Sequence, residues 1–300
     1  METNYHIPVL LNESIEGLAI ASTGIYVDAT YGGGGHSRKI LEQLGNGTLI
    51  AFDQDVDARY NIIDDQRLIF VHQNFRFLKN FLRYHGFEQV DGVLADLGVS
   101  SHDFDVPDRG FSFRFEGRLD MRMNQTALKT AEQVINEYEE KDLEMIFRDY
   151  GELSNARKTA SVIVESRQRN PIRTTQELCS VLEPLVPQKA ANKYLAKVFQ
   201  ALRIEVNQEL DVLKSFLNDV VDVLKPGGRL VVISYHSLED RLVKNLIQKG
   251  GFSGEAEKDF YGNVQAKFRP VCKKAIVPSE EEVRINPRAR SAKLRIAEKI

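Results

Sequence analysis

Four consecutive glycines lie where the chain passes from a predicted strand to a predicted helix. Gly32–Gly35 follows the apolar segment 24–30 and precedes a helical stretch from about residue 36 to residue 44. Glycines permit a tight turn and let a ligand come close to the backbone, and the free N–H groups at the start of a helix favour an anionic group. Rossmann-like folds bind nucleotides at this position. The structural alternative is a loose loop without a ligand.

Carboxylates end two further predicted strands. Asp53 ends the segment 48–53, about 20 residues beyond the glycines, where a carboxylate can accept hydrogen bonds from both hydroxyls of a ribose. Asp96 ends the segment 90–96 and can lie beside the reacting group, because the carboxyl ends of parallel strands face the ligand crevice. The alternatives are an exposed helix cap for Asp53 and a cap or structural acid for Asp96.

The glycine loop and Asp53 fit either a dinucleotide or S-adenosyl-L-methionine. The glycines do not follow the usual G-x-G-x-x-G pattern of a dinucleotide site, and Asp28 just before them would repel a pyrophosphate. The ammonium and sulfonium of S-adenosylmethionine would tolerate that carboxylate. The segment 224–230, Leu-Lys-Pro-Gly-Gly-Arg-Leu, is also typical of methyltransferases. These residues favour S-adenosylmethionine, with a dinucleotide-dependent oxidoreductase as the alternative.

Two histidines and one arginine-rich stretch allow both functional and structural interpretations. His36 and His236 could do acid–base work, or could cap the loop and orient a strand end. A second group of side chains could bind phosphate and stack on bases, or could be core with solvated charges. This group interleaves Arg109, Arg114, Arg118 and Arg122 with Phe111, Phe113 and Phe115.

A mostly parallel sheet would place these residues together. Strand signals cover 24–30, 48–53, 68–71 and 90–96 and are separated by helical patterns, which predicts βαβ units. From about 104 to 205 helical stretches dominate instead, at 130–150, 155–168, 175–185 and 189–204. The α/β pattern resumes with a helix at 206–224 and a strand at 229–234. The sheet domain is therefore predicted to contain a helical insertion.

Composition excludes several protein classes. With 42% hydrophobic and 28% charged residues, the chain is typical of a globular protein. The only two cysteines, Cys179 and Cys272, exclude a disulfide framework and a cysteine-based zinc site, and they suit a reducing cytosol. No apolar run reaches about 18 residues, and the first residues do not resemble a secretion signal. We therefore expect a cytoplasmic protein without a membrane partner.

Charge is unevenly distributed along the chain. Residues 1–100 carry 13 acidic and 7 basic residues, whereas residues 267–300 carry 4 and 10. The alternation of apolar and basic residues from 292 to 297 predicts an edge or penultimate strand whose Lys293 and Arg295 reach solvent. Arg288 and Arg290 precede it in a predicted loop. They could contact phosphate, or belong to a solvated terminus.

Several motifs follow one another in a fixed order along the chain, and together they indicate a family far more specifically than the glycine loop does. These motifs are His6-x-Pro8-Val9-Leu10-Leu11-x-Glu13, 28–37, 96–101, 109–113, 119–123, 200–204, 206–210, His236-Ser237-Leu238-Glu239-Asp240-Arg241 and 286–292. By them the chain resembles the RsmH family, formerly called MraW, the bacterial 16S rRNA cytosine-N4 methyltransferases.

The resemblance implies an α/β fold, a Rossmann-like class I methyltransferase sheet with an inserted all-helical substrate domain. The methyltransferase domain would comprise 1–103 and 206–300, and the RNA-recognition domain 104–205. The implied reaction is S-adenosylmethionine-dependent methylation of N4 of cytidine 1402 (standard rRNA numbering) in 16S rRNA. The substrate RNA would lie within the small ribosomal subunit, and no metal would take part.

The resemblance also implies a set of cofactor contacts, which carries over onto Gly34, Gly35, His36, Asp53, Phe75 and Asp96. Phe75 could pack on adenine, or it could be a core residue. Asp103 stands where the family usually has a cofactor-binding glutamine, and a carboxylate cannot donate as an amide does. Asp96 is the candidate catalytic residue, as the acceptor of a proton from the amino group.

One further alternative is a non-catalytic ribosome assembly factor that binds the same cofactor. DNA amino-methyltransferases are disfavoured, because they place Pro-Pro-aromatic after the acid where this chain has Leu97-Gly98-Val99.

Overall fold

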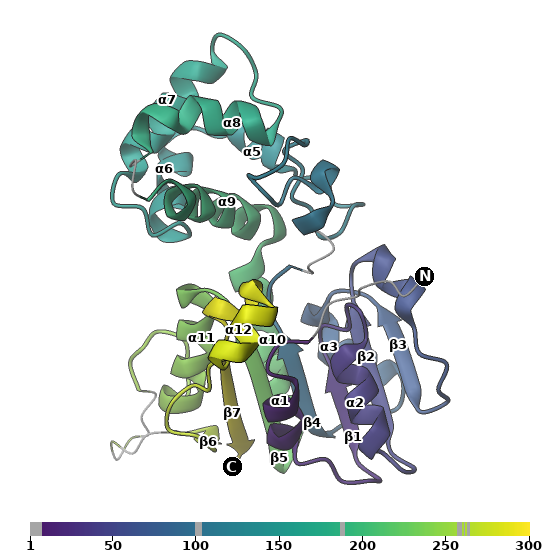
Figure 1. Ribbon diagram of the computed structural model, residues 1–300. Coiled ribbons are helices and arrows are strands. Elements are labelled where there is room, and N and C mark those ends of the chain that lie inside the picture. The colour runs from purple at the N-terminus through teal and green to yellow at the C-terminus, as the bar shows by residue number, and fades with distance from the viewer. Residues whose placement is uncertain (1–7, 100–103, 187–189, 257–259, 261, 263–264) are drawn as a thin grey trace. The chain divides into compact units, whose positions relative to one another are not determined.

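The computed structural model describes residues 8–99, 104–186, 190–256, 260, 262 and 265–300. The chain divides into two compact units, one formed by residues 1–98 and 210–300 and the other by residues 99–209. Figure 1 shows the sheet of the first unit and the helices of the second. No helix in the described ranges is long and apolar enough to cross a bilayer.

The first unit is built on a seven-stranded sheet. Its strands are β1 (Ile25–Asp28), β2 (Thr48–Asp53), β3 (Leu68–His72), β4 (Val90–Asp96), β5 (Leu224–Ser234), β6 (Phe268–Pro270) and β7 (Lys293–Lys299). The strand order is β3-β2-β1-β4-β5-β7-β6. The first five strands pair in parallel, whereas β7 runs antiparallel to both of its neighbours. The segment 292–297, predicted as an edge or penultimate strand, belongs to the penultimate strand β7.

Helices cover both faces of this sheet (Figure 1). They are α1 (Leu11–Leu18), α2 (Gly35–Gln43), α3 (Leu78–Tyr84), α10 (Glu209–Val223), α11 (Ser237–Lys249) and the short α12 (Glu280–Ile285). Helices α1 and α2 pack on one face, and α3, α10 and α11 pack on the other. The order reverses between β1 and β4, so the ligand crevice of such a sheet lies beyond the carboxyl ends of these strands.

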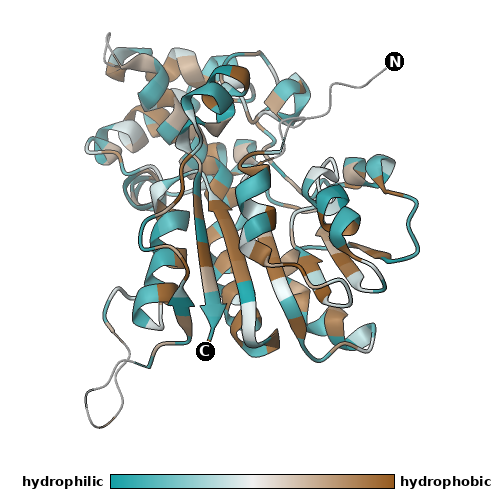
Figure 2. Ribbon diagram, turned by 60° about the horizontal axis from the view of Figure 1, so that its bottom comes forward, coloured by the Kyte–Doolittle hydropathy of each residue, from teal (hydrophilic) through white to brown (hydrophobic). Residues whose placement is uncertain are grey.

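Strand residues alternate between the two faces. Tyr26 and Leu94 belong to the core under α1 and α2, whereas their neighbours Val27, Val93 and Ala95 belong to the core under α3, α10 and α11. Because both faces are buried, the strands read as continuous apolar runs. Figure 2 shows the strands of the sheet largely in the brown of hydrophobic residues.

The second unit is helical and has its own core. Its helices are α5 (Ala131–Glu137), α6 (Glu140–Asp149), α7 (Ala156–Arg167), α8 (Thr175–Leu182) and α9 (Ala191–Asn207). All the residues of its apolar cluster come from this unit. The predicted fold class, a class I methyltransferase sheet with a helical insertion, is confirmed.

Two helix boundaries were predicted wrongly. The expected helix 130–150 is two helices, because Tyr138 and Glu139 adopt extended backbone between α5 and α6. The expected helix 206–224 begins only at Glu209, because Gln208 has a φ of 53° and ends α9. A non-glycine residue in this left-handed region interrupts the helical hydrogen bonds even where the apolar periodicity continues.

Candidate functional site

The loop after β1 bridges the two strands at which the order reverses. Ala29 donates its N–H to the carbonyl of Leu94 in β4 at 2.8 Å, so the loop first continues the pairing with β4. Two residues later Tyr31 donates to the carbonyl of Phe52 in β2 at 2.9 Å. The backbone thus crosses from one strand to the other directly before the glycines. Gly32–Gly35 is therefore held at the carboxyl edge of the sheet, as the sequence predicts.

Gly34 and Gly35 in this loop cannot carry a side chain, each for a different structural reason. Gly34 has a φ of 74°, and a Cβ there would lie 2.7 Å from the hydroxyl oxygen of Tyr31. A Cβ at Gly35 would lie 2.1 Å from Cγ of Pro8, so Pro8 packs directly on the loop. Helix α2 begins at Gly35, and the N–H groups of a first helical turn have no helical partners. The loop therefore leads into a helical turn with unpaired N–H groups on a tightly packed base.

Asp53 is engaged by the glycine loop. Its Oδ2 accepts the N–H of Gly32 at 2.7 Å, and its Oδ1 accepts the N–H of Asp55 at 2.8 Å. Burial raises the pKa of Asp53 to about 6. The cap of the following 3₁₀ helix (Val56–Asn61) is Asp55, whose side chain accepts the N–H of Asp57. Asp53 is thus not the cap, and each of its carboxylate oxygens retains a lone pair for a further donor.

Phe75 begins a short 3₁₀ helix three residues after β3 ends at His72. Strand β3 pairs with β2 so that His72 lies opposite Asp53, which places this turn at the same edge of the sheet. The Phe75 ring is partly buried and meets Phe216 edge to face, with centroids 5.0 Å apart. The ring thus borders the core, and an adenine contact stays a prediction.

Asp96 lies among polar groups from three elements. Its backbone N–H donates to Oγ1 of Thr30 at 2.7 Å, and its Oδ1 accepts the O–H of Tyr235 at 2.8 Å. Its Oδ2 lies 4.0 Å from Nδ1 of His36. Burial raises the pKa of Asp96 to about 6, although 20% of the side chain is exposed. A carboxylate with such a pKa can accept a proton near neutral pH and release it again.

Asp28 and His36 make buried hydrogen bonds that hold the glycine loop in place. Asp28 is 1% exposed, and it accepts the hydroxyl of Ser37 at 2.7 Å and the N–H of Thr30 at 3.1 Å. Burial raises the pKa of Asp28. Nε2 of His36 lies 3.2 Å from the carbonyl of Val9, so this nitrogen donates and Nδ1 faces Asp96. The contacts of His36 favour its structural role in lining the loop.

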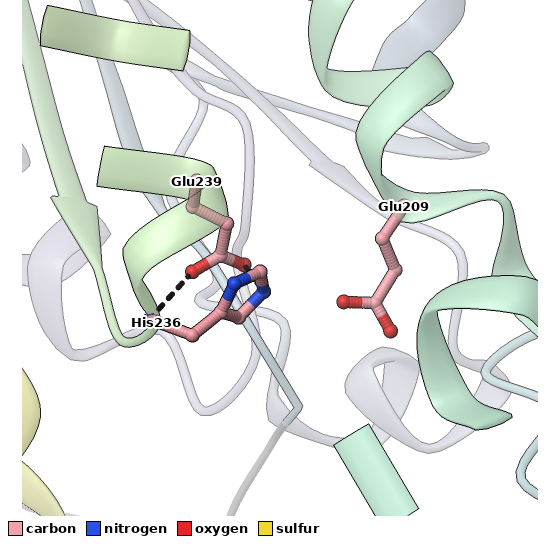
Figure 3. A group of neighbouring side chains, drawn as sticks. All are labelled: Glu209, His236 and Glu239. Carbon is pink, nitrogen blue, oxygen red and sulfur yellow. Dashed lines mark hydrogen bonds and ion pairs between the residues drawn. The ribbon is translucent and has the colours of Figure 1, made fainter. Parts of the chain in front are cut away.

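His236 is the N-cap residue of α11, directly beyond β5. Figure 3 shows its imidazole beside the carboxylate of Glu239, with Nε2 and Oε1 3.1 Å apart. The other oxygen of Glu239 accepts the backbone N–H groups of Tyr235 and His236. These contacts support the interpretation that His236 orients a strand end. Glu209, also drawn in Figure 3, is the last residue of the second unit and pairs there with Arg203.

The arginines and phenylalanines between 109 and 122 divide into two sets. Arg109 is buried, donates to the carbonyl of Arg122 at 3.0 Å and stacks over Phe111. Phe113 meets Phe199 edge to face, so these side chains are structural. The side chain of Arg122 pairs with Asp120. The remaining three side chains, Arg114, Phe115 and Arg118, are exposed.

Arg288 and Arg290 are exposed on a 3₁₀ turn (Pro287–Ser291) that Ala289 anchors in the core. This turn leads into β7, whose Lys293 lies opposite Ser234 at the carboxyl end of β5. The turn therefore lies at the same edge of the sheet as Asp96.

The prediction that Arg295 reaches solvent is wrong. Its side chain is 15% exposed, and Nε donates to Oδ1 of Asp240 in α11 at 2.6 Å. Lys293 is exposed, but it too lies within 3.4 Å of Asp240. Strand alternation gives the side of the sheet to which a residue points, but it does not show that a helix covers that side.

Sequence reasoning missed Tyr235 and Thr30, which both contact Asp96. Tyr235 follows the last residue of β5, so the strand-end rule that selected Asp53 and Asp96 could also have selected it. Asp103, the remaining expected cofactor contact, lies outside the described residues.

Comparison with known proteins gives matches over nearly the whole chain. A family model described as the MraW methylase family matches residues 3–300. The ribosomal RNA small subunit methyltransferase H of Flavobacterium johnsoniae is 60% identical over 297 residues, which cover 99% of this chain and 98% of that protein. The protein of the same name from Bacteroides thetaiotaomicron is 59% identical over 299 residues, with the same coverage.

A crystal structure of an rRNA methylase from Streptococcus thermophilus is also similar. It covers 98% of this chain and 99% of its own, with 13% sequence identity and a TM-score of 0.45.

Proposed function

Since the chain belongs to the MraW methylase family, we propose that it methylates N4 of cytidine 1402 (standard rRNA numbering) in 16S rRNA, with S-adenosylmethionine as the methyl donor. The observation that carries the proposal is the 60% identity, over almost the full length of both chains, to a protein named as a small-subunit rRNA methyltransferase.

The residues at the carboxyl edge of the sheet fit this cofactor. Asp53 has carboxylate lone pairs left for the hydroxyls of a ribose. The N–H groups in the first turn of α2, which have no helical partners, can donate to the cofactor, and Phe75 supplies an aromatic face at the end of β3. We propose that these residues, with His36 in the loop and Asp96 on β4, hold S-adenosylmethionine.

When bound, S-adenosylmethionine supplies a methyl group on a positively charged sulfur. The chain must supply a proton acceptor, because the lone pair of the cytosine amino group is delocalised into the ring and the nitrogen is a weak nucleophile. Asp96 fits this role, since burial raises its pKa to about 6 and it stays largely ionised at neutral pH. Holding the amino group near this carboxylate would supply much of the remaining acceleration.

We propose two phosphate-binding regions for the RNA. One is the exposed set Arg114, Phe115 and Arg118 of the helical unit, where guanidinium groups and an aromatic ring suit single-stranded RNA. The other is the turn carrying Arg288 and Arg290. In this proposal the helical unit recognises the substrate, which is 16S rRNA within the small ribosomal subunit.

Methyl transfer to defined substrates tests the proposal. The purified chain is incubated with S-adenosylmethionine and either small-subunit particles from a strain lacking the methylation or naked 16S rRNA. We expect N4-methylcytidine at position 1402, found by mass spectrometry of nuclease fragments. Cofactor binding by calorimetry without methyl transfer to either substrate would favour a non-catalytic assembly factor. Binding of NAD instead of S-adenosylmethionine would favour an oxidoreductase.

A further inference from the structure

We propose that Tyr235 is a positioning residue for methyl transfer, whose phenolic O–H holds the Asp96 carboxylate ionised and leaves its second oxygen free to accept the amino proton. The inference rests on the proposed function, in which Asp96 is the proton acceptor. Tyr235 itself would touch neither the cytosine nor the methyl donor.

The pairing of β4 with β5 brings the two residues together. Asp96 lies opposite Ile233, and Leu97 extends the pairing by donating its N–H to the carbonyl of Ile233 at 2.9 Å. Tyr235 follows two residues after Ile233 and donates to Oδ1 of Asp96 at 2.8 Å. The contact joins residues 139 positions apart in the sequence. It therefore depends on the register of two central strands.

Gly98 provides room for the phenol ring. A Cβ at this position would lie 3.3 Å from Cδ2 of Tyr235, and the φ of Gly98 is 106°, where a side chain is strained. The motif Asp96-Leu97-Gly98 therefore contains both the acid and the gap in which its partner lies.

The charges around Asp96 explain why it needs this donor. Asp28 from β1 and Glu239 from α11 raise its pKa, as burial does, whereas His36 from α2 and the Tyr235 hydroxyl lower it. Burial and the nearby carboxylates, with Glu282 of α12 among them, also raise the pKa of Tyr235 well above 10. Tyr235 therefore keeps its proton across the working pH range and can only donate to Asp96.

The two oxygens of Asp96 then have separate roles. Oδ1 is occupied by the Tyr235 hydroxyl, whereas Oδ2 has His36 at 4.0 Å, beyond hydrogen-bond distance. As the amino nitrogen bonds to the methyl carbon, the carbon–sulfur bond breaks and its electron pair stays on sulfur. The excess proton leaves nitrogen for Oδ2, and at neutral pH it passes to water, to which 20% of the Asp96 side chain is exposed. Tyr235 gains and loses no proton.

The test is the pH dependence of Tyr235→Phe, with Tyr26→Phe as its control. Tyr26 is a tyrosine of the same unit that is more fully buried than Tyr235, but its hydroxyl accepts the N–H of Ala21, before the start of β1. Single-turnover rates on small-subunit particles are measured from pH 5 to 9, and cofactor affinity is measured by calorimetry. The wild-type rate should fall as pH drops through about 6.

In Tyr235→Phe we expect the acid limb to move upward by about one pH unit, because the lost donor no longer favours the ionised carboxylate. The rate at pH 6 should fall about 5-fold and recover toward pH 9, with cofactor affinity changed less than about 2-fold. Tyr26→Phe should keep the wild-type profile. An acid limb at the wild-type pH in Tyr235→Phe would overturn the inference.

A second variant covers the case in which Tyr235→Phe does not fold. Incorporating 3,5-difluorotyrosine at position 235 keeps the ring and makes the hydroxyl a stronger donor, so the acid limb should move to lower pH. An unmoved limb would again overturn the role of Tyr235. Either result leaves the proposed function standing as long as the wild-type chain methylates the particles, whereas an inactive wild-type chain would contradict the proposed function itself.

Discussion

Burying a carboxylate costs free energy, and Asp53 and Asp96 both carry that cost. Burial raises each pKa to about 6, above the value of about 3.9 expected in the unfolded chain. For a group whose pKa rises on folding, the stabilising contribution is fully present below the unfolded pKa and is lost as pH rises through the folded pKa. At neutral pH both residues should therefore destabilise the fold, as expected of groups retained for function.

Asp96→Asn should make the protein more stable and much less active. The amide is neutral and can still accept the Tyr235 hydroxyl, so the free energy of unfolding at pH 7.5 should rise by about 1–2 kcal/mol. This gain in the free energy of unfolding should develop between about pH 4 and pH 6. Methyl transfer should fall by about 100-fold or more. Urea unfolding across this pH range provides the measurement. A variant less stable than the wild type at pH 7.5 would show that the ionised carboxylate stabilises the fold.

For single residues, the sequence predicts the candidate functional carboxylates better than it predicts the side chains that contact them. Asp53 and Asp96 could be singled out because each ends an apolar run, and the carboxyl ends of parallel strands meet at one edge. Tyr235 could not be paired with Asp96 in the same way. That contact requires the register between β4 and β5, which is set by packing across 139 residues of sequence.

Among the elements, the glycine loop depends on Pro8, which packs on it. Gly35→Ala should displace Pro8, because the new Cβ would lie 2.1 Å from Cγ of that ring. We expect a loss of about 1–3 kcal/mol in the free energy of unfolding and weaker S-adenosylmethionine binding.

Gly45→Ala is the matched control for this substitution. Its new Cβ would meet only Ser22, at an ordinary distance of 3.5 Å. Calorimetry and thermal unfolding of both variants give the comparison. Equal effects of the two substitutions would remove any special role for the contact between Gly35 and Pro8.

The predicted end of a helix is wrong where a residue far away in the sequence stabilises the observed end. β2 and β4 were predicted with the observed bounds, because their apolar runs end at aspartates. Helix α5 stops at Glu137 because the side chain of Arg167, in α7, donates to the carbonyls of Ile135 and Tyr138. A helix end satisfied by a side chain about 30 residues away leaves no signal in the local periodicity.

At the scale of the whole molecule, each of the two units has its own apolar core. We therefore expect that cofactor binding can be separated from methyl transfer. We expect that replacing residues 104–209 by a short Gly-Ser linker leaves a folded sheet unit, because its apolar clusters contain no residue of the helical unit. This variant should bind S-adenosylmethionine with nearly wild-type affinity and lose methyl transfer. Circular dichroism and calorimetry test the first part. A folded sheet unit that fails to bind the cofactor would place part of the cofactor site within 104–209.

The 3₁₀ turn Pro287–Ser291, which carries Arg288 and Arg290, should contribute to RNA binding without affecting the affinity for the cofactor. Arg288→Ala combined with Arg290→Ala should weaken RNA binding and reduce its dependence on salt, by about one to two units of the log–log slope. Filter binding across a salt series measures the slope. Loss of thermal stability with an unchanged slope would instead assign these arginines to the fold.

The order of the strands also has a consequence for synthesis on the ribosome. β7 is made after every other strand, yet it occupies a place inside the sheet between β5 and β6. Until it emerges, the edge of β5 has unpaired backbone groups, and the core positions of Leu294 and Ile296 are unfilled. A nascent chain in this state carries the kind of open strand edge that chaperones cover. A message broken before codon 293 would yield a protein that keeps this edge open permanently, and such a fragment is a natural target for proteolysis.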